Sequence, residues 1–120
     1  MIGSTRNVRV FAYPAPADLR KGFDALVGLV TRDLGLNALS GDCYLFANRQ
    51  RTSAKVLHFD GTGLCVYAKR LEQGRFACLW KEGDGEPVRL TMSELALFLE
   101  GSQLAGRVPL SPPVLLSATG

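Results

Sequence analysis

Apolar and polar residues alternate along several short stretches of the chain, and this period of two is typical of β-strands. Val8–Tyr13 (VRVFAY) is the first such stretch, and Cys43–Ala47 (CYLFA) is apolar on both faces, as in an interior strand. We expect a shorter extended piece at Phe76–Trp80 and a brief edge strand at Pro87–Leu90, since proline cannot donate a ladder hydrogen bond.

The clearest strand pair lies in the centre of the chain. AKVLHF and LCVYAK flank the tight reversal Asp60–Gly63 (DGTG), which predicts an antiparallel hairpin. A turn centred on Gly61 and Thr62 would pair Phe59 with Leu64, Leu57 with Val66 and Lys55 with Ala68, on a face that we expect to be buried. The opposite face would then carry Val56, His58, Cys65, Tyr67 and Lys69, with an aromatic ring beside a cation.

Two segments have helical periodicity. Asp18 is a candidate N-cap for a helix that runs to about Asp33 and would place Arg20 and Lys21 in its first turn. Its expected inward stripe is Leu19, Phe23, Leu26, Val27 and Val30. Thr91–Glu94 is a capping-box pattern that predicts the start of a second helix, and Gly101 is its natural end.

The strands follow one another, with one helix after the first strand and one near the C-terminus. This order predicts an α+β domain with a mainly antiparallel sheet of about four to six strands. We expect one domain over residues 1–107 and a flexible tail over 108–120, where three prolines occur without periodicity. No apolar run reaches the roughly 18 residues that span a bilayer, and the N-terminus lacks the core of a signal peptide, so we expect a cytoplasmic location.

Positive charge is concentrated in the hairpin region. The chain carries a net charge of +3, whereas Asn48–Arg75 has six basic residues and two acidic ones, a net +4. The basic residues are Arg49, Arg51, Lys55, Lys69, Arg70 and Arg75. Four of them stand at neighbouring ends of the antiparallel pair, which suggests a nucleic-acid-binding edge with Tyr67 as a stacking platform.

An ordinary solvated rim explains the same charges, and spacing alone slightly favours it. Arg20 and Lys21 could hold a phosphate, although pairing with Asp18 or Asp24 is their simpler role.

Candidate catalytic chemistry is sparse. The carboxylates have no spacing that marks a metal site, and neither a nucleophile motif nor a phosphate-binding loop occurs. Cys43, Cys65 and Cys78 form no C-x-x-C pair, so we expect buried thiols rather than a disulfide framework or zinc site. His58 is the single histidine, and we expect a structural role for it. We therefore predict no enzyme activity, no metal and no cofactor.

Several spaced motifs together resemble a known family. They are DLRKG at 18–22, the segment from Asn48 to Lys55, DGTG at 60–63, and KRLE followed by GRF between 69 and 76. In this order they closely resemble the TnpB-type accessory protein, the second open reading frame product, of IS66-family bacterial insertion sequences. The resemblance covers about Val8 to Gly101 and departs from the family pattern at Ala77–Trp80, where tryptophan-proline is common.

The resemblance implies a small protein encoded beside a separate DDE-type transposase and needed for full transposition, with no established catalytic residues. Its expected partners are DNA at the insertion-sequence ends, the cognate transposase and the other element-encoded accessory protein. The alternative is a protein–protein adaptor without direct DNA binding, motivated by the acidic second helix and the tail. A metal-dependent nuclease is a third hypothesis, for which we expect no DNA cleavage.

Overall fold

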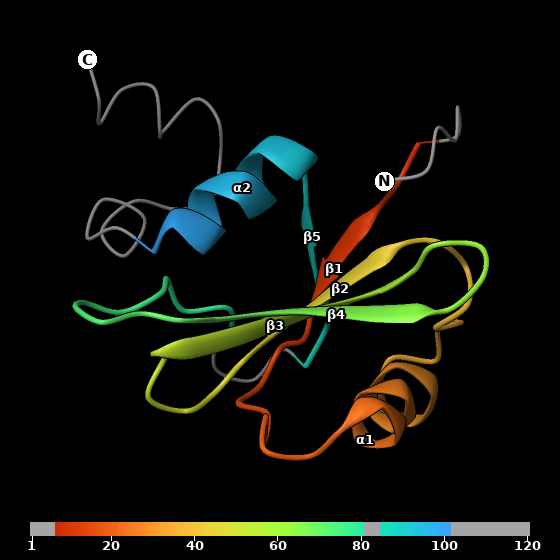
Figure 1. Cartoon of the computed structure of the whole chain (residues 1–120), viewed down its shortest axis with the longest axis horizontal. Coiled ribbons are helices and arrows are strands. Elements are labelled where there is room, and N and C mark those ends of the chain that lie inside the picture. The colour runs from red at the N-terminus through yellow and green to blue at the C-terminus, as the bar shows by residue number, and fades with distance from the viewer. Residues whose placement is uncertain (1–6, 81–84, 102–120) are drawn as a thin grey trace.

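A single mixed sheet organises the computed structural model, which describes residues 7–80 and 85–101. The five strands of the described chain lie in the order β4-β3-β2-β1-β5 (Figure 1). Their bounds are β1 Val10–Ala12, β2 Cys43–Ala47, β3 Ser53–Phe59, β4 Leu64–Arg70 and β5 Val88–Leu90. All neighbours run antiparallel except β1 and β2. The predicted α+β class with a mainly antiparallel sheet is confirmed, whereas the predicted tail lies outside the described residues.

Helices cover the two faces of this sheet. The connection from β1 to its parallel neighbour β2 contains α1 (Phe23–Gly28), which continues into the π-helical turn η1 (Leu29–Asp33). α2 (Met92–Glu100) packs on the opposite face (Figure 1). We call these faces the α1 side and the α2 side. Neither helix in the described part of the chain is long and apolar enough to cross a membrane.

The first helix begins later than the sequence pattern predicts. Asp18 is not its N-cap, because the carboxylate instead accepts hydrogen bonds from the backbone N–H and guanidinium of Arg20, at 3.1 and 3.0 Å. The helix starts at Phe23, so Arg20 and Lys21 precede it rather than forming its first turn. The expected inward position of Phe23 is also wrong, since this side chain is 49% exposed, while Leu26 is buried as predicted.

The capping box of α2 is confirmed. Glu94 N donates to Thr91 Oγ1 at 3.0 Å, and Thr91 N donates to Glu94 Oε1 at 2.8 Å. Gly101 ends the helix with a φ of 62°, in the left-handed region that glycine adopts without strain. Two backbone donors at the helix start are thus satisfied by side chains, and Glu94 is nearly buried.

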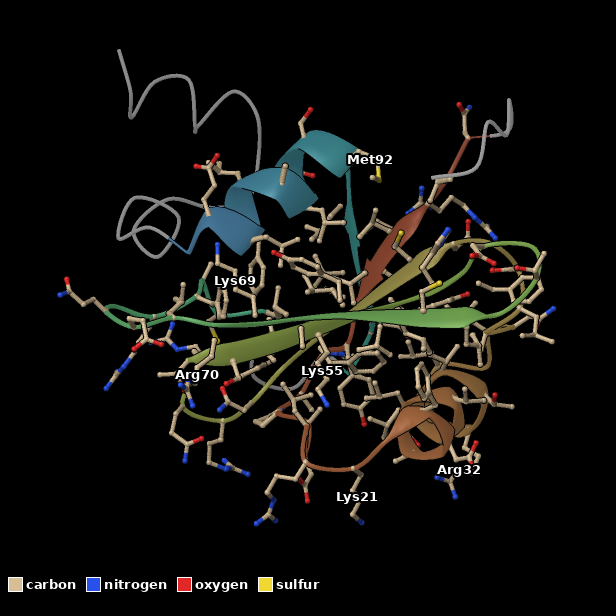
Figure 2. All side chains as sticks on the ribbon, viewed as in Figure 1. Lys21, Arg32, Lys55, Lys69, Arg70 and Met92 are labelled. Carbon is tan, nitrogen blue, oxygen red and sulfur yellow. The ribbon has the colours of Figure 1, made fainter. Side chains whose placement is uncertain are left out.

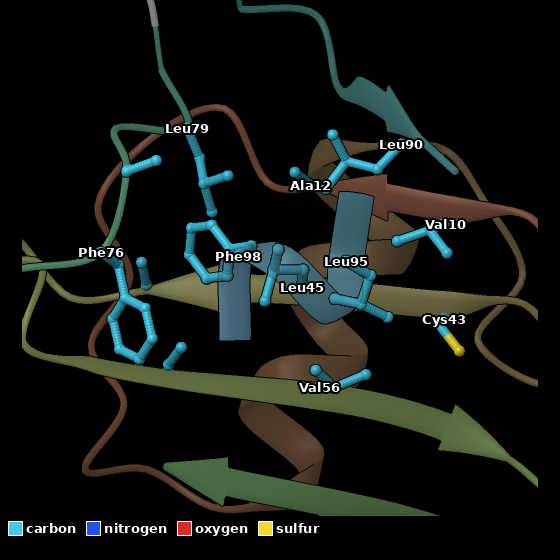
Figure 3. Close-up of a cluster of buried hydrophobic side chains, with 13 residues drawn as sticks. Val10, Ala12, Cys43, Leu45, Val56, Phe76, Leu79, Leu90, Leu95 and Phe98 are labelled. Atoms are coloured by element: carbon cyan, nitrogen blue, oxygen red, sulfur yellow. The ribbon is translucent and has the colours of Figure 1, made fainter. Parts of the chain in front are cut away.

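The interior strand β2 divides the core into two clusters. All five of its residues are buried, as the apolar pattern of CYLFA predicts. Cys43 and Leu45 join the α2-side cluster, where Phe76 and Phe98 stack with ring centroids 4.9 Å apart (Figure 3). On the α1 side the cluster comprises Phe11, Ala17, Leu19, Leu26, Val30, Ala38, Tyr44, Phe46 and Leu57.

The segment Phe76–Trp80 is not a strand. Phe76 N donates to Arg51 O at 2.7 Å, a contact with the loop between β2 and β3 rather than with a sheet ladder. Phe76 and Leu79 are nevertheless buried in the α2-side cluster. The apolar residues of this segment therefore close the core without adding a strand.

The hairpin β3–β4 has the predicted register. Lys55 pairs with Ala68, Leu57 with Val66 and Phe59 with Leu64. β4 is an edge strand, and its α2-side residue Cys65 is exposed; Cys78 also faces outward between two buried neighbours. The prediction of three buried thiols is thus correct for Cys43 only.

Candidate nucleic-acid interface

A groove of about 890 Å³ lies where the ends of β3 and β4 meet two loops. One loop precedes α1 and includes 16–20, and the other connects β2 to β3 and includes 48–50. Five cations and one carboxylate are among its lining residues, a local formal charge of 5 − 1 = +4: Arg20, Arg49, Lys55, Lys69, Arg70 and Asp18. We call this the basic groove.

Asn48 shapes the loop between β2 and β3. Its side-chain oxygen accepts hydrogen bonds from the backbone N–H groups of Thr52 and Ser53, at 2.9 and 3.1 Å. Its carbonyl accepts from Arg51 N at 3.0 Å. The loop is therefore a tight turn that holds Arg49 at its exposed tip, on the wall of the groove.

Lys55 connects β3 to the loop before α1. Its ammonium donates to the carbonyl of Leu19 at 2.6 Å, so it spans from the sheet to a residue 36 positions earlier. An ammonium has three donors, which leaves two of them for a ligand in the groove. The half-buried Lys55 thus both fixes the groove wall and places a cation on the α1 side (Figure 2).

Arg20 and Asp18 form an ion pair at 3.0 Å on the other wall. The hydrogen bonds from Arg20 lower the pKa of Asp18 to about 2, so this carboxylate is charged at neutral pH.

Arg70 approaches Glu72 at 3.7 Å, with both side chains more than three-quarters exposed. Exposed ion pairs contribute little free energy, so a phosphate can replace Glu72 as the partner of Arg70 at little cost.

The structure brings together only some of the predicted binding residues. Arg49, Lys55, Lys69, Arg70 and Arg20 line the basic groove. Lys69 lies on its border, because its side chain rises on the α2 side while that of Lys55 points to the α1 side (Figure 2).

Four predicted residues do not line the groove: Arg51, Arg75, Lys21 and Tyr67. Arg51 adopts a φ of 62° and directs its carbonyl to Phe76, whereas Lys21 lies at the far end of the α1 side (Figure 2). Tyr67 is 54% exposed on the α2 side, in an apolar recess of about 250 Å³ that also includes Met92, Val56 and His58. The tyrosine and the groove are thus on opposite faces of the hairpin.

The loop before α1 contributes to the groove in a way that the sequence pattern does not predict. Pro16, Ala17 and Leu19 form part of the groove lining, and Leu19 supplies the carbonyl that binds Lys55. The two prolines of residues 14–17 (PAPA) are typical of a loop, but nothing in the local sequence indicates that this loop lies against β3.

Two further ionisable groups, Asp42 and Tyr13, serve the fold. Burial opposes ionisation of Asp42, but hydrogen bonds from the guanidinium and backbone of Arg9 outweigh it, and the pKa of Asp42 is lowered. Burial and a hydrogen bond to Asp33 raise the pKa of Tyr13 to about 12. Within residues 7–80 and 85–101, no three His, Cys, Asp or Glu side chains are grouped so that they could hold a metal ion.

These features define a small α+β protein with a cationic groove at one end of a hairpin. Residues 8–108 match the family model described as IS66 Orf2 like protein, and the chain belongs to this family. Family membership makes it an accessory protein associated with transposition of IS66-type insertion sequences. The resemblance inferred from the spaced motifs is confirmed.

Two relatives from Sinorhizobium fredii are similar to the chain. The uncharacterized protein y4hO is 36% identical over 101 residues, which cover 84% of this chain and 86% of the relative. The uncharacterized protein y4jC is 33% identical over 76 residues, covering 63% of this chain and 65% of the relative. No solved structure matches the chain significantly.

Proposed function

We propose that this protein assists transposition of an IS66-type element by holding the DNA backbone in the basic groove, without catalysing a step itself. One observation carries the proposal: five cations from separate segments of the chain line one groove, and the described lining of that groove contains a single carboxylate. The formal charge of the groove is +4, although that of the whole chain is +3. Positive charge on this protein is therefore concentrated where a polyanion would be bound.

The lining of the groove favours phosphate contacts over base stacking. Its apolar residues are Pro16, Ala17, Leu19, Ala54 and Ala68, and none of its described lining residues is aromatic. Base stacking on protein depends on aromatic rings, and Tyr67 lies on the other side of the hairpin. Guanidinium and ammonium groups bind phosphate without reading sequence, so we infer binding to duplex backbone with little sequence preference.

The strength of such binding depends on salt. Arg20 is occupied by Asp18, which leaves four cations in the groove for phosphates. Each phosphate neutralised on B-DNA contributes about −0.9 to the slope of log affinity against log salt, so four contacts give roughly −3.6.

Fluorescence anisotropy of a labelled duplex carrying the insertion-sequence end, titrated with the protein at several salt concentrations, tests the proposal. We expect a slope near −3.6, similar affinity for unrelated duplex and no preference for single strands. Absence of binding at low ionic strength, or binding that salt does not weaken, would contradict it.

The family association with the transposition machinery leads us to propose direct contact with the cognate transposase and the other accessory protein of the element. Glu94 is used in the capping box, so the exposed Glu100 is the acid of α2 open to such a partner. A pull-down of the transposase, with and without nuclease treatment, separates protein contact from tethering by DNA. Capture that survives nuclease treatment supports direct contact, and capture lost on treatment contradicts it.

The absence of catalysis is also tested directly. Incubation of the pure protein with labelled DNA and Mg²⁺ or Mn²⁺ should leave the DNA uncut. A DNA-cleaving activity that copurifies with the protein and requires the metal ion would overturn this part of the proposal.

A further inference from the structure

Among the described residues, no further strand pairs with the outer edge of β4. This strand spans seven residues at one end of the sheet, whereas the other edge strand, β5, has only three. Figure 1 shows β4 nearest the viewer, with no helix in front of it. Edge strands are usually short, interrupted by proline or bulged, because open backbone groups promote pairing with another chain. β4 has no proline, pairs with β3 in an uninterrupted register and carries its two charged residues, Lys69 and Arg70, at one end only, so its outer edge is suited to strand addition.

The ladder shows which backbone groups face the open side. Asp60 N donates to Gly63 O and Leu71 N donates to Thr52 O, at the two ends of the hairpin. Hydrogen-bonded positions alternate in an antiparallel pair, so Cys65, Tyr67 and Lys69 direct their backbone groups to β3. The four residues that direct theirs outward are Leu64, Val66, Ala68 and Arg70.

These outward positions are symmetric about Tyr67. We propose that β4 pairs antiparallel with β4 of a second copy of this chain, with a twofold axis at Tyr67. In this register Leu64 lies opposite Arg70 and Val66 opposite Ala68 of the other copy. The outward-facing backbone N–H and C=O groups of one copy therefore face those of the other. A twofold interface requires this self-complementarity.

Side chains on the α2 side complement each other in the same register. Tyr67, which is 54% exposed, meets its own counterpart on the axis, beside the apolar recess of each copy. Lys69 lies opposite Cys65 of the other copy, and the Cys65 thiol is 3.5 Å from the carboxylate of Asp60. A Lys69 side chain is long enough to approach this Asp60 carboxylate across the interface, twice per dimer, and such a surface pair still yields to a phosphate at little cost. The two Lys69 side chains stay apart.

The dimer would place both basic grooves on one face. Pairing continues the sheet, so the α1 sides of the two copies face the same way. Arg70 lies opposite Leu64, six positions away, and the two Arg70 residues are therefore about 20 Å apart at roughly 3.4 Å per residue. This dimer does not depend on DNA binding, and its test is independent of the proposed function.

Light scattering after size exclusion, at several concentrations of the full chain, measures the dimer. We expect a mass approaching twice the chain mass of 13.0 kDa. Tyr67→Glu places two carboxylates on the axis and should raise the dissociation constant by about tenfold or more. Ala68→Pro should also disrupt the dimer, since it removes an outward N–H that β3 does not use.

Phe23→Glu is the matched control, because Phe23 is 49% exposed and belongs to α1 rather than to β4. It should remain dimeric, and circular dichroism should show that all variants are folded. If the protein has the mass of a single chain at every concentration, the proposal is overturned. That result is expected if the β4 edge instead pairs with a different protein. A dimer that both β4 variants leave intact also overturns it.

Cross-linking tests the register. In a Cys78→Ser background, Lys69→Cys would place a new thiol opposite Cys65 of the other copy, at a separation that suits a disulfide. Oxidation should give a covalent dimer in high yield, whereas Phe23→Cys in the same background should not. Equal cross-linking of the two variants would contradict the proposed pairing.

Discussion

Neutralising two cations of the basic groove should weaken DNA binding by an amount that follows from the number of contacts. Arg49→Gln with Arg70→Gln removes two of the four cations available to phosphate. The slope of log affinity against log salt should become less steep by about 1.8, from roughly −3.6 to roughly −1.8. If the parent and the double variant bind DNA equally at 1 M salt, this difference in slope makes the variant bind about 60-fold more weakly than the parent at 0.1 M salt.

Stability should change little in this double variant. Arg49 is exposed, and Arg70 makes only a 3.7 Å pair with the exposed Glu72. Exposed pairs contribute about 0–1 kcal/mol, so the melting temperature should remain close to that of the parent protein. A loss of DNA binding would then report on the contacts rather than on unfolding.

The matched control is Arg51→Gln with Arg75→Gln. It causes the same change in net charge, and both residues come from the same part of the chain but do not line the groove. Anisotropy titrations across a salt series should show near-parental binding for this control, and transposition should fall only in the groove variant. Equal losses in the two variants would mean that total charge governs binding, which would refute the assignment to the groove.

Other predictions concern stability, measured by urea unfolding. Gly101→Ala should destabilise more than Gly35→Ala: both glycines have φ near 65°, but only at Gly101 would a Cβ clash with a neighbouring side chain, that of Leu71. Thr91→Ala should cost about 1 kcal/mol through loss of the helix cap. Backbone hydrogen bonds in its turn lower the pKa of Asp60 from 3.8 to about 2, so its stabilising contribution should be present above pH 4 and lost towards pH 2. Asp60→Asn should reduce this part of the acid sensitivity, and an unchanged pH profile would contradict that assignment.

Local interactions could be predicted from the sequence. The β3–β4 register follows from the DGTG reversal and the period of two, and the α2 start follows from the reciprocal bonds of Thr91 and Glu94. The start of α1 could not be predicted from the sequence, because Asp18 can either cap a helix or bind Arg20, and the local sequence is compatible with both arrangements. The parallel pairing of β1 with β2 is likewise a long-range choice that strand order alone does not specify.

Only the part of the candidate interface that depends on local sequence patterns could be predicted, because its other contacts are long-range. Alternation along the hairpin correctly placed Tyr67 on the face opposite Lys55, and neighbouring strand ends brought Arg49 near Lys69 and Arg70. Arg51 was expected with them, but its left-handed backbone and its bond to Phe76 hold it outside the groove. That bond depends on the packing of a distant segment in the core, which no local pattern encodes.

Backbone amide chemical shifts, recorded while duplex DNA is added to the labelled protein, locate the DNA-binding surface residue by residue. The largest changes should occur along 16–20, 48–55 and 68–70, the segments that contain the groove lining. Amides on the α2 side, around Met92 and the start of α2, should change little. Chemical-shift changes centred on the α2 side, or no changes at a concentration where anisotropy reports binding, would mean that DNA does not bind in the basic groove.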